Sequence, residues 1–587
     1  MILQSLVTYY ETLAAKGEIS RSGWGMVKVS CALEIDAEGQ LLQAFSLKES
    51  DAKGKKMVTR IMTLPAPVKR GKGIAPNFLC DGGSYFLGLD DKGKAERTQN
   101  CFAAAKELHL SLLGACISPC AKAICAFFEH WNADTARENP ALSDCMDDIL
   151  QGGNLVFLFE NAFAQDDAEI AAAWQTYYEG DAAKNDVKMR CMVTGKLVSP
   201  ALIHPWIKGV RDAQSSGAAL ISFNAPADCS YGREQNANAP VGTYAAFAYT
   251  TALNHLLAKR DAEGRPLCSK LVGDTTVVYW AEDAALQYQS AFSAFLDGAD
   301  DSVTADDLHA FMSAIAEGRA ANWDNEPLSP ENHFYVLGLA PNAARLSVRF
   351  FERDTFGAMT AHIKQHFDRL SIVPDGKSKW IDIPLWALLR ETVNENARVK
   401  MPSPQMAGEM LSAILTGGRY PATLYQQTQL RIRADRQITR GRAAIIKAYL
   451  MRNTINEEYK EVLNVNLNEQ TTYQPYVLGR LFSVLEAIQQ RANPGINTTI
   501  KDKYFSSACA TPAMVFPTLL NLADKHLKKM DTGSTVYYAK QLGALTALIT
   551  ESYPAHQTLP DQGIFQLGYY HQTQKRYEKK VENKEEN

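Results

Sequence analysis

The stretch that decides how the C-terminal part of the chain folds is Leu478-Gly479-Arg480-Leu481-Phe482-Ser483-Val484-Leu485-Glu486-Ala487-Ile488. Its three leucines, its phenylalanine and its isoleucine recur at i, i+3, i+4, i+7 and i+10, a spacing that places them on one face of an α-helix. Such a face must be covered by neighbouring elements, and further helical patterns lie on both sides of it. We therefore predict a helical bundle over residues 409–572.

The N-terminal part of the chain has strand patterns instead. Apolar residues alternate over 27–33, residues 36–39 have turn composition, and 41–47 can form the returning strand. This order is typical of a β-hairpin. Helical patterns fill 95–150 and 167–179, and further strand patterns occur at 57–64, 85–89, 155–159, 276–280 and 346–351. The predicted fold class is an α+β N-terminal region followed by an all-α C-terminal helical bundle.

Strand patterns fade after about Trp386, and a segment with Pro402 and Pro404 then has linker composition. The residues after Gln572 are almost all polar, so we expect them to fray. We predict four parts: an α+β N-terminal region over 1–395, a linker over 396–408, the bundle over 409–572 and a polar tail over 573–587.

The overall composition excludes some classes of protein. The 587 residues hold 61 Lys and Arg against 65 Asp and Glu, a formal net charge of -4 that argues against a general nucleic-acid binder. The charge is segregated, however. Residues 297–331 sum to -8, and 419–452 sum to +7.

Targeting features point to the cytoplasm. The 11 cysteines form no C-x-x-C pair, which suits a reducing compartment without a zinc or redox site. The first apolar helical pattern has no basic residues before it, so we predict an amphipathic helix and not a signal peptide. Residues 110–128 approach the length of a membrane span, but Pro119 and Lys122 interrupt them, and a buried helical hairpin is the better interpretation.

Catalytic signatures are absent from the sequence. It has no G-x-S-x-G, H-E-x-x-H or G-x-G-x-x-G pattern. Residues 88–95 approach a phosphate-binding loop, but Ala95 replaces the required Ser or Thr, so a turn at 90–93 is favoured. His362 and His366 are one helical turn apart without a third ligand. We predict no catalytic residues, metal or cofactor.

Three polar or basic segments remain. Residues 69–78 form a Gly-rich loop in which Lys69, Arg70 and Lys72 could neutralise phosphates and Asn77 could bond base edges. The alternative is a solvated turn between strands.

The second segment, 419–452, holds Arg431, Arg433, Arg436, Arg440 and Arg442, and either an anionic partner or a solvated helix face explains its charge. The third contains Lys208, Arg211, Gln235 and Asn236, which suit DNA contact or a hydrogen-bonded core loop.

Read in order, these segments resemble the large subunit of the type I-C CRISPR surveillance complex, Cascade. The resemblance rests on Asn77-Phe78-Leu79-Cys80-Asp81, Ser230-Tyr231-Gly232, Gly479-Arg480-Leu481-Phe482 and Gln562-Gly563-Ile564-Phe565-Gln566-Leu567-Gly568-Tyr569-Tyr570-His571-Gln572. Further blocks lie at 1–6, 68–76, 84–88, 193–195, 222–224, 431–435 and 504–508. The ordered set covers nearly the whole chain.

The resemblance implies a non-catalytic subunit of an antiviral defence complex. It would read the protospacer-adjacent motif (PAM) on double-stranded DNA, assist duplex opening and R-loop formation under crRNA guidance, and help recruit the helicase-nuclease. Its other partners would be the Cascade backbone subunits, the subunit that holds the 5′ handle of the crRNA, and a small subunit. No membrane is involved.

The resemblance also assigns roles to the residues above. PAM reading falls on Asn77 with Lys69, Arg70 and Lys72, and the segment of Lys208, Arg211, Gln235 and Asn236 is a second DNA-contact candidate. The five arginines from Arg431 to Arg442 would track nucleic-acid backbone.

The helical part could also be made separately as a small subunit from an internal start. We predict Met451 as that start, with Met401, Met406 and Met410 as competitors. The alternative functions are a divergent metal-dependent nuclease using His366 and a general DNA-binding protein without a guide.

Overall fold

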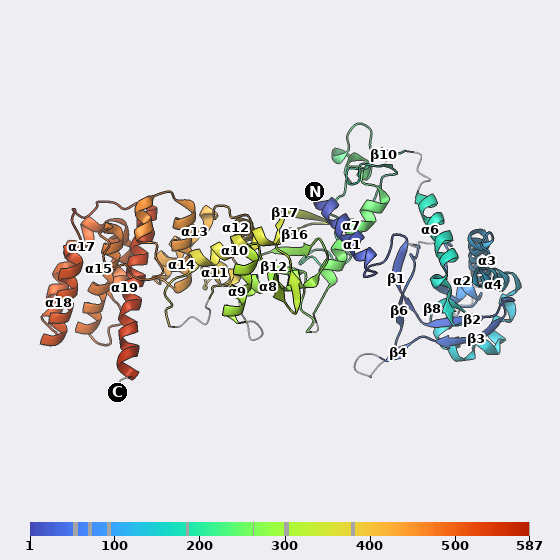
Figure 1. Cartoon of the computed structure of the whole chain (residues 1–587), viewed down its shortest axis with the longest axis horizontal. Coiled ribbons are helices and arrows are strands. Elements are labelled where there is room, and N and C mark those ends of the chain that lie inside the picture. The colour runs from blue at the N-terminus through green and yellow to red at the C-terminus, as the bar shows by residue number, and fades with distance from the viewer. Residues whose placement is uncertain are drawn as a thin grey trace. The chain divides into compact units, whose positions relative to one another are not determined.

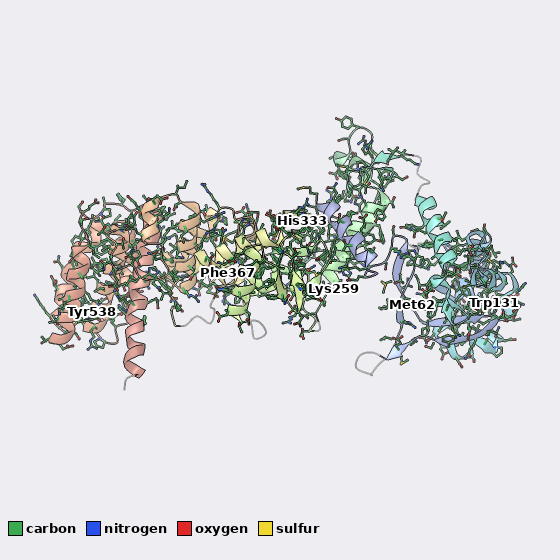
Figure 2. All side chains as sticks on the ribbon, in the orientation of Figure 1. Met62, Trp131, Lys259, His333, Phe367 and Tyr538 are labelled. Carbon is green, nitrogen blue, oxygen red and sulfur yellow. The ribbon has the colours of Figure 1, made fainter. Side chains whose placement is uncertain are left out.

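The computed structural model describes residues 1–50, 57–68, 73–90, 95–182, 187–261, 263–298, 304–376, 382–398 and 400–585. The chain forms two compact units (Figure 1). Unit 1 comprises Met1–Pro205 and Ile221–Ala252, and unit 2 comprises Trp206–Leu220 and Leu253–Asn587. Each unit has a hydrophobic interior, to which Trp131 of unit 1 and Phe367 of unit 2 contribute (Figure 2).

The main sheet of unit 1 has the strand order β3-β2-β8-β7, with β9 paired to β8. Strands β2 (Cys31–Ile35) and β3 (Leu41–Ser46) form the predicted antiparallel hairpin, and β8 (Asn154–Phe159) runs parallel to β2. The remaining strands are β7 (Cys80–Gly82) and β9 (Ala162–Phe163). The sheet packs against helices through aromatic side chains, including Phe86 stacked on Phe157 with ring centroids 4.9 Å apart.

Helices α3 (Ala95–Leu113) and α4 (Pro119–His130) form the predicted hairpin, with Pro119 in the first turn of α4. Other helices here are α2 (Gly83–Phe86), α5 (Met146–Leu150) and α6 (Ala168–Ala182), with 3₁₀ turns η1 (Ala133–Glu138), η2 (Pro140–Cys145) and η3 (Ala164–Asp166). No helix in the described part of the chain is long and apolar enough to span a bilayer.

Smaller elements complete unit 1. Strands β1 (Trp24–Val29) and β6 (Arg60–Pro65) form an antiparallel ribbon, as do β4 (Glu49–Ser50) with β5 (Met57–Val58), and β10 (Met189–Arg190) with β11 (Leu197–Val198). Helix α1 (Ile2–Ala15) packs on α7 (Thr243–Ala258) where Tyr10 meets Phe247 edge to face. The turns η4 (Pro226–Asp228) and η5 (Gln235–Asn238) precede α7.

Unit 2 begins with an antiparallel sheet of order β12-β13-β16-β17. Its strands are β12 (Ser269–Val272), β13 (Thr275–Ala281), β16 (His333–Asn342) and β17 (Arg345–Thr355). Helices α8 (Leu286–Asp297), α9 (Ala305–Ala316) and α10 (Phe356–Leu370) bury Tyr279, Phe292 and Phe334 of this core, and β14 (Ala321–Trp323) pairs with β15 (Glu326–Leu328).

The rest of unit 2 is helical, so the predicted fold class is confirmed. Its elements are α11 (Leu385–Arg390), α12 (Pro404–Thr416), α13 (Ala422–Asp435), α14 (Arg440–Asn453), η6 (Glu457–Glu461), α15 (Gln474–Ala492), α16 (Ile500–Ala510), α17 (Pro512–Leu527), α18 (Thr532–Ala547) and α19 (Leu559–Glu585). One continuous cluster of buried side chains runs from the sheet through α19. Figure 1 shows α15 and α19 side by side near the C-terminus.

The sequence prediction for 85–89 was wrong. Residues 83–86 form α2, because the carbonyl of Gly83 accepts from the amides of both Leu87 and Leu89 and the chain turns on itself. Tyr85 and Phe86 are buried in that turn. A short apolar run cannot be assigned to strand or helix from its pattern alone.

The C-terminal tail does not fray where we expected. Helix α19 continues to Glu585, and its Thr573 hydroxyl lies 2.8 Å from that of Ser483, whose carbonyl also accepts from Arg576 at 3.1 Å. Helix α12 begins at Pro404, inside the predicted linker, and the two compact units divide elsewhere. The division at 396–408 stays a prediction. The predicted turn at 90–93 lies mostly outside the described residues.

Candidate nucleic-acid interface

The Gly-rich loop connects β6 to β7 in unit 1. Lys69, Arg70 and Lys72 lie outside the described residues. Asn77 lies at the C-terminal end of the loop, where its Oδ1 accepts from the amide of Val68 at 2.9 Å. The backbone amide of Asn77 donates to Oδ2 of Asp81 at 2.8 Å. Asn77 therefore ties together the two ends of the segment that contains the predicted phosphate contacts.

The residues after Asn77 fix this end of the loop in the core of unit 1. Phe78 is buried and stacks on Trp174 with ring centroids 5.4 Å apart. Leu79 has a φ of +58°, and its amide donates to Nε2 of His109 at 3.0 Å. Burial lowers the pKa of His109 to about 4, so the ring is neutral and able to accept at neutral pH. The C-terminal end of the loop is thus fixed in the core of unit 1.

The second DNA-contact candidate is split between the two units. Lys208 and Arg211 belong to unit 2, where both side chains are exposed and the amide of Arg211 donates to Thr276 Oγ1 at 3.1 Å. Gln235 and Asn236 belong to unit 1. Gln235 is exposed, whereas Asn236 is 2% exposed and its amide donates to the carbonyl of Leu202. Asn236 therefore anchors its loop and does not present a side chain to solvent.

The five arginines of the basic segment do not share one exposed face. Arg431, Arg440 and Arg442 are buried. The Arg442 guanidinium lies 2.5 Å from Asp435 and 3.4 Å from Glu391, an arrangement that belongs to the interior of the bundle. Of the five, only Arg433 and Arg436 are exposed, so these two side chains are the remaining candidates for contact with nucleic-acid backbone.

The histidine of the nuclease hypothesis is also buried. His366 is 3% exposed, its Nδ1 lies 2.7 Å from the hydroxyl of Tyr420, and burial lowers its pKa to about 3. Neighbouring His362 bonds the carbonyl of Leu415 through Nδ1 at 2.8 Å. Across the residues that the structure describes, no three His, Cys, Asp or Glu side chains are grouped to hold a metal ion.

A family model for CRISPR-associated proteins, Cas_Csd1, matches residues 6–577. The chain belongs to this family. It is therefore the large subunit of a type I-C Cascade, and the resemblance inferred from the sequence is confirmed. A search of curated proteins found no match.

The C-terminal block of this Cas_Csd1 chain, Gln562–Gln572, lies on α19 and is bonded inside the bundle. Gln566 and Gln429 exchange two hydrogen bonds of 2.7 and 2.9 Å. Gln562 accepts from Arg433 at 2.8 Å, and Gln572 accepts from Arg480 at 3.1 Å. These contacts give the block a structural role that the sequence alone did not assign.

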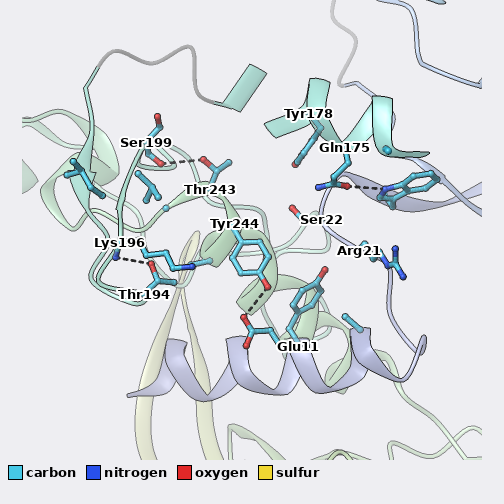
Figure 3. Close-up of a pocket in the computed structure, with 18 of the residues that line it drawn as sticks. Glu11, Arg21, Ser22, Gln175, Tyr178, Thr194, Lys196, Ser199, Thr243 and Tyr244 are labelled. Atoms are coloured by element: carbon cyan, nitrogen blue, oxygen red, sulfur yellow. Dashed lines mark hydrogen bonds between the residues drawn. The ribbon is translucent and has the colours of Figure 1, made fainter. Parts of the chain in front are cut away.

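Sequence reasoning also missed a pocket of about 1130 Å³ in unit 1 (Figure 3). Its wall includes Lys196, Thr243 and Tyr244, and Tyr244 donates to Oε1 of Glu11 at 3.1 Å. Cys191 lies beside it and accepts from the amides of Val193, Thr194 and Gly242. Burial alone would raise the pKa of this thiol, but the hydrogen bonds from the three amides together outweigh burial, so the pKa lies below its usual value. The block Val193-Thr194-Gly195 was the available signal for this thiol, because the amides of Val193 and Thr194 in this turn donate to the Cys191 sulfur.

The structure leaves the internal start undecided. Met451 lies in the last turn of α14, and Met401 lies before α12, both with exposed side chains. Met406 and Met410 are buried within α12. The start at Met451 stays a prediction.

Proposed function

We propose that this large subunit reads the PAM on duplex DNA through the loop between β6 and β7, and that it assists opening of the duplex so that the crRNA can pair. The observation that carries the proposal is the attachment of this basic, Gly-containing loop to a rigid base through Asn77. A fixed base lets the loop hold phosphates without losing its register on the base pairs.

The carboxamide of Asn77 has a donor for base recognition. Its Oδ1 is occupied by the amide of Val68, and Nδ2 has no hydrogen-bond partner among the residues that the structure describes. A donor of this kind matches the acceptors that the minor groove presents, adenine N3 and thymine O2. Because A·T and T·A present similar acceptors there, we expect partly degenerate readout. Lys69, Arg70 and Lys72 would hold the adjacent phosphates.

Family membership supports the remaining roles. A Cascade large subunit works with the crRNA, the backbone subunits, the subunit at the 5′ handle and a small subunit, and we propose that it also helps recruit the helicase-nuclease. It contributes no catalytic residue in this scheme, since base pairing supplies the long-sequence specificity and the protein reads only a short motif.

Two substitutions of Asn77 test PAM reading. Asn77→Asp keeps an oxygen that can accept from Val68 but removes the donor, whereas Asn77→Ala removes both. In the assembled complex we expect both variants to lose preference for a PAM-containing duplex over the same duplex with an altered motif, by about fivefold or more for one lost hydrogen bond. Binding to a complementary single strand should be unchanged.

The comparison separates base reading from loop support. An added carboxylate repels phosphates on every duplex equally, so only the ratio between the two duplexes reports the base contact. If Asn77→Asp keeps the full preference for the PAM-containing duplex and Asn77→Ala loses it, Asn77 only holds the two ends of the loop together and does not contact a base. Equal loss on duplex and single strand would reject the assignment.

The nuclease alternative has its own test. Purified protein with Mg²⁺ or Mn²⁺ should leave DNA and RNA uncut, because His366 is buried and bonded to Tyr420. Cutting that disappears in His366→Ala but persists in His362→Ala would restore that alternative.

A further inference from the structure

Tyr231 presents its whole ring to solvent. Its side chain is 98% exposed, the highest fraction among the large apolar side chains of the described residues. Burying an aromatic ring is among the largest apolar gains available to a side chain. A ring held this far out of the fold is therefore available to a partner.

The backbone under Tyr231 is held in a conformation that disfavours tyrosine. Tyr231 and Gly232 have φ values of +55° and +69°, and the amide of Arg233 donates to the carbonyl of Ser230 at 3.0 Å. This pair of positive φ values is that of a type I′ turn, in which Asn, Asp or Gly is preferred at both central positions. Such strain in a bulky residue persists only where the surroundings enforce it.

Asn238 enforces the turn. Its Oδ1 accepts from the amide of Ser230 at 2.9 Å, and its Nδ2 donates to the carbonyls of Arg233 at 3.2 Å and Gln235 at 2.8 Å. The loop is anchored at its other end by the buried Asn236, whose amide donates to Leu202. The ring of Tyr231 is thus displayed from a braced support.

We infer that Tyr231 is a base-stacking contact, whose ring lies on an unpaired base of the target DNA where the duplex has opened. This inference rests on the proposed function. Exposed Arg233 and Glu234 are adjacent and opposite in charge, so the loop is no phosphate-binding stripe and the ring is its main binding feature. Every base has a face on which such a ring can stack, regardless of sequence.

Tyr231→Asn is the decisive variant, because asparagine tolerates positive φ and cannot stack like tyrosine. We expect its melting temperature to equal or exceed that of the wild type. In the assembled complex, binding to a fully paired PAM-containing target should weaken about fivefold to 150-fold, the range for one lost base stack. Tyr231→Phe should stay within about twofold of the wild type.

An abasic scan identifies the base. Targets with one abasic nucleotide at each position beside the PAM, on each strand, are bound by wild type and Tyr231→Asn. At one position, the abasic nucleotide should lower the affinity of the wild type by as much as Tyr231→Asn lowers it on the intact target. The same abasic nucleotide should not lower the affinity of Tyr231→Asn any further. Additive losses at every position, or a variant that binds the paired target like the wild type, would overturn the inference.

A control distinguishes a protein partner. Ile203 is 72% exposed in the segment that includes Leu202, the anchor of the loop. If the surface docks another subunit, Ile203→Ala and Tyr231→Asn will both lower the yield of assembled complex, which would also overturn the inference. A wild-type complex that ignores the PAM would instead reject the proposed function itself, so the two failures are distinguishable.

Discussion

Arg436 and Arg442 lie on the same basic segment, but their surroundings give them different tasks. Arg442 is 6% exposed between Asp435 and Glu391, whereas the Arg436 side chain is 52% exposed and lies 3.5 Å from Asp502. An exposed ion pair contributes little to stability, but removing one member of a buried pair leaves an uncompensated charge. Charge counts along the sequence do not distinguish these cases.

The first residue-scale prediction concerns Arg433 and Arg436. In Arg433→Gln with Arg436→Gln, the plot of log affinity for target DNA against log salt concentration should flatten by about 0.7 to 0.9 per lost phosphate contact. Arg442→Gln is the matched control, because it removes a buried arginine of the same segment. It should lower the free energy of unfolding by about 3–5 kcal/mol through its buried partners, without changing the slope of the salt plot. An unchanged slope in the double variant would mean that neither arginine contacts phosphate in the complex.

The second residue-scale prediction concerns acid. The folded protein holds His109 neutral with a pKa of about 4, below the value of about 6.5 in an unfolded chain. The unfolded state therefore binds more protons, and the free energy of unfolding should fall as the pH drops from about 6.5 toward 4. The slope is about 1.4 kcal/mol per pH unit for one such histidine.

His109→Gln isolates this contribution, because glutamine can accept from Leu79 but does not titrate. Urea unfolding between pH 7 and pH 4.5 should show a shallower pH dependence in the variant. An identical dependence would mean that His109 is not kept neutral. Folded His109 gains its proton only near its pKa of about 4, so the loop of Asn77 should lose its PAM preference near pH 4 in the wild type only, since protonation removes the acceptor for the amide of Leu79.

At the scale of elements, α15 and α19 touch through backbone. A Cβ at Gly479 would lie 1.9 Å from the carbonyl oxygen of Phe565, and one at Gly568 would lie 2.1 Å from that of Tyr476. Both contacts are with backbone, which cannot rotate away as a side chain can. The glycines therefore fix how closely the helices approach.

We predict that Gly479→Ala and Gly568→Ala each lower the free energy of unfolding by about 3 kcal/mol, at the upper end of the usual cost of overpacking. Gly543 in α18 is the control, since a Cβ there would meet nothing within 4 Å. Gly543→Ala should stabilise the protein by about 0.4–1 kcal/mol. Urea unfolding measures all three, and a neutral Gly479→Ala would contradict the close helix contact.

Elements with local signals could be predicted from the sequence, and those set by distant contacts could not. The apolar spacing at 478–488 identified α15, and alternation identified β2 and β3. The helix at Gly83–Phe86 was missed because a short apolar run does not distinguish strand from helix, and the burial of Arg442 depends on Glu391, 51 residues away. The loop around Asn77 was found from composition, but its support by His109 left no pattern in the sequence.

At the scale of the whole molecule, the question is which part of unit 2 can exist separately. Helix α13 bonds the start of α19 at three places: Tyr425 donates to the carbonyl of Leu559 at 2.9 Å, Gln429 pairs with Gln566, and Arg433 donates to Gln562. Residues Ala443–Ile446 of α14 are buried in the same core. A product that starts at Met451 lacks all of these contacts, whereas one that starts at Met401 keeps them.

We therefore expect the chain 401–587 to unfold at higher urea concentration than 451–587. Both lose the same contacts with residues before 401, such as the bond from Tyr570 to the carbonyl of Val373, so the difference isolates α12 to α14. In cells, a start at Met451 predicts that Met451→Leu abolishes the separate small subunit and that Met401→Leu does not, as mass spectrometry of the purified complex would show. Loss in Met401→Leu alone would move the start to Met401, the product that keeps the contacts of α13 with α19. A product that begins at Met451 and unfolds no earlier than 401–587 would mean that α15 to α19 form a self-sufficient bundle, with the Gln429–Gln566 pair dispensable for it.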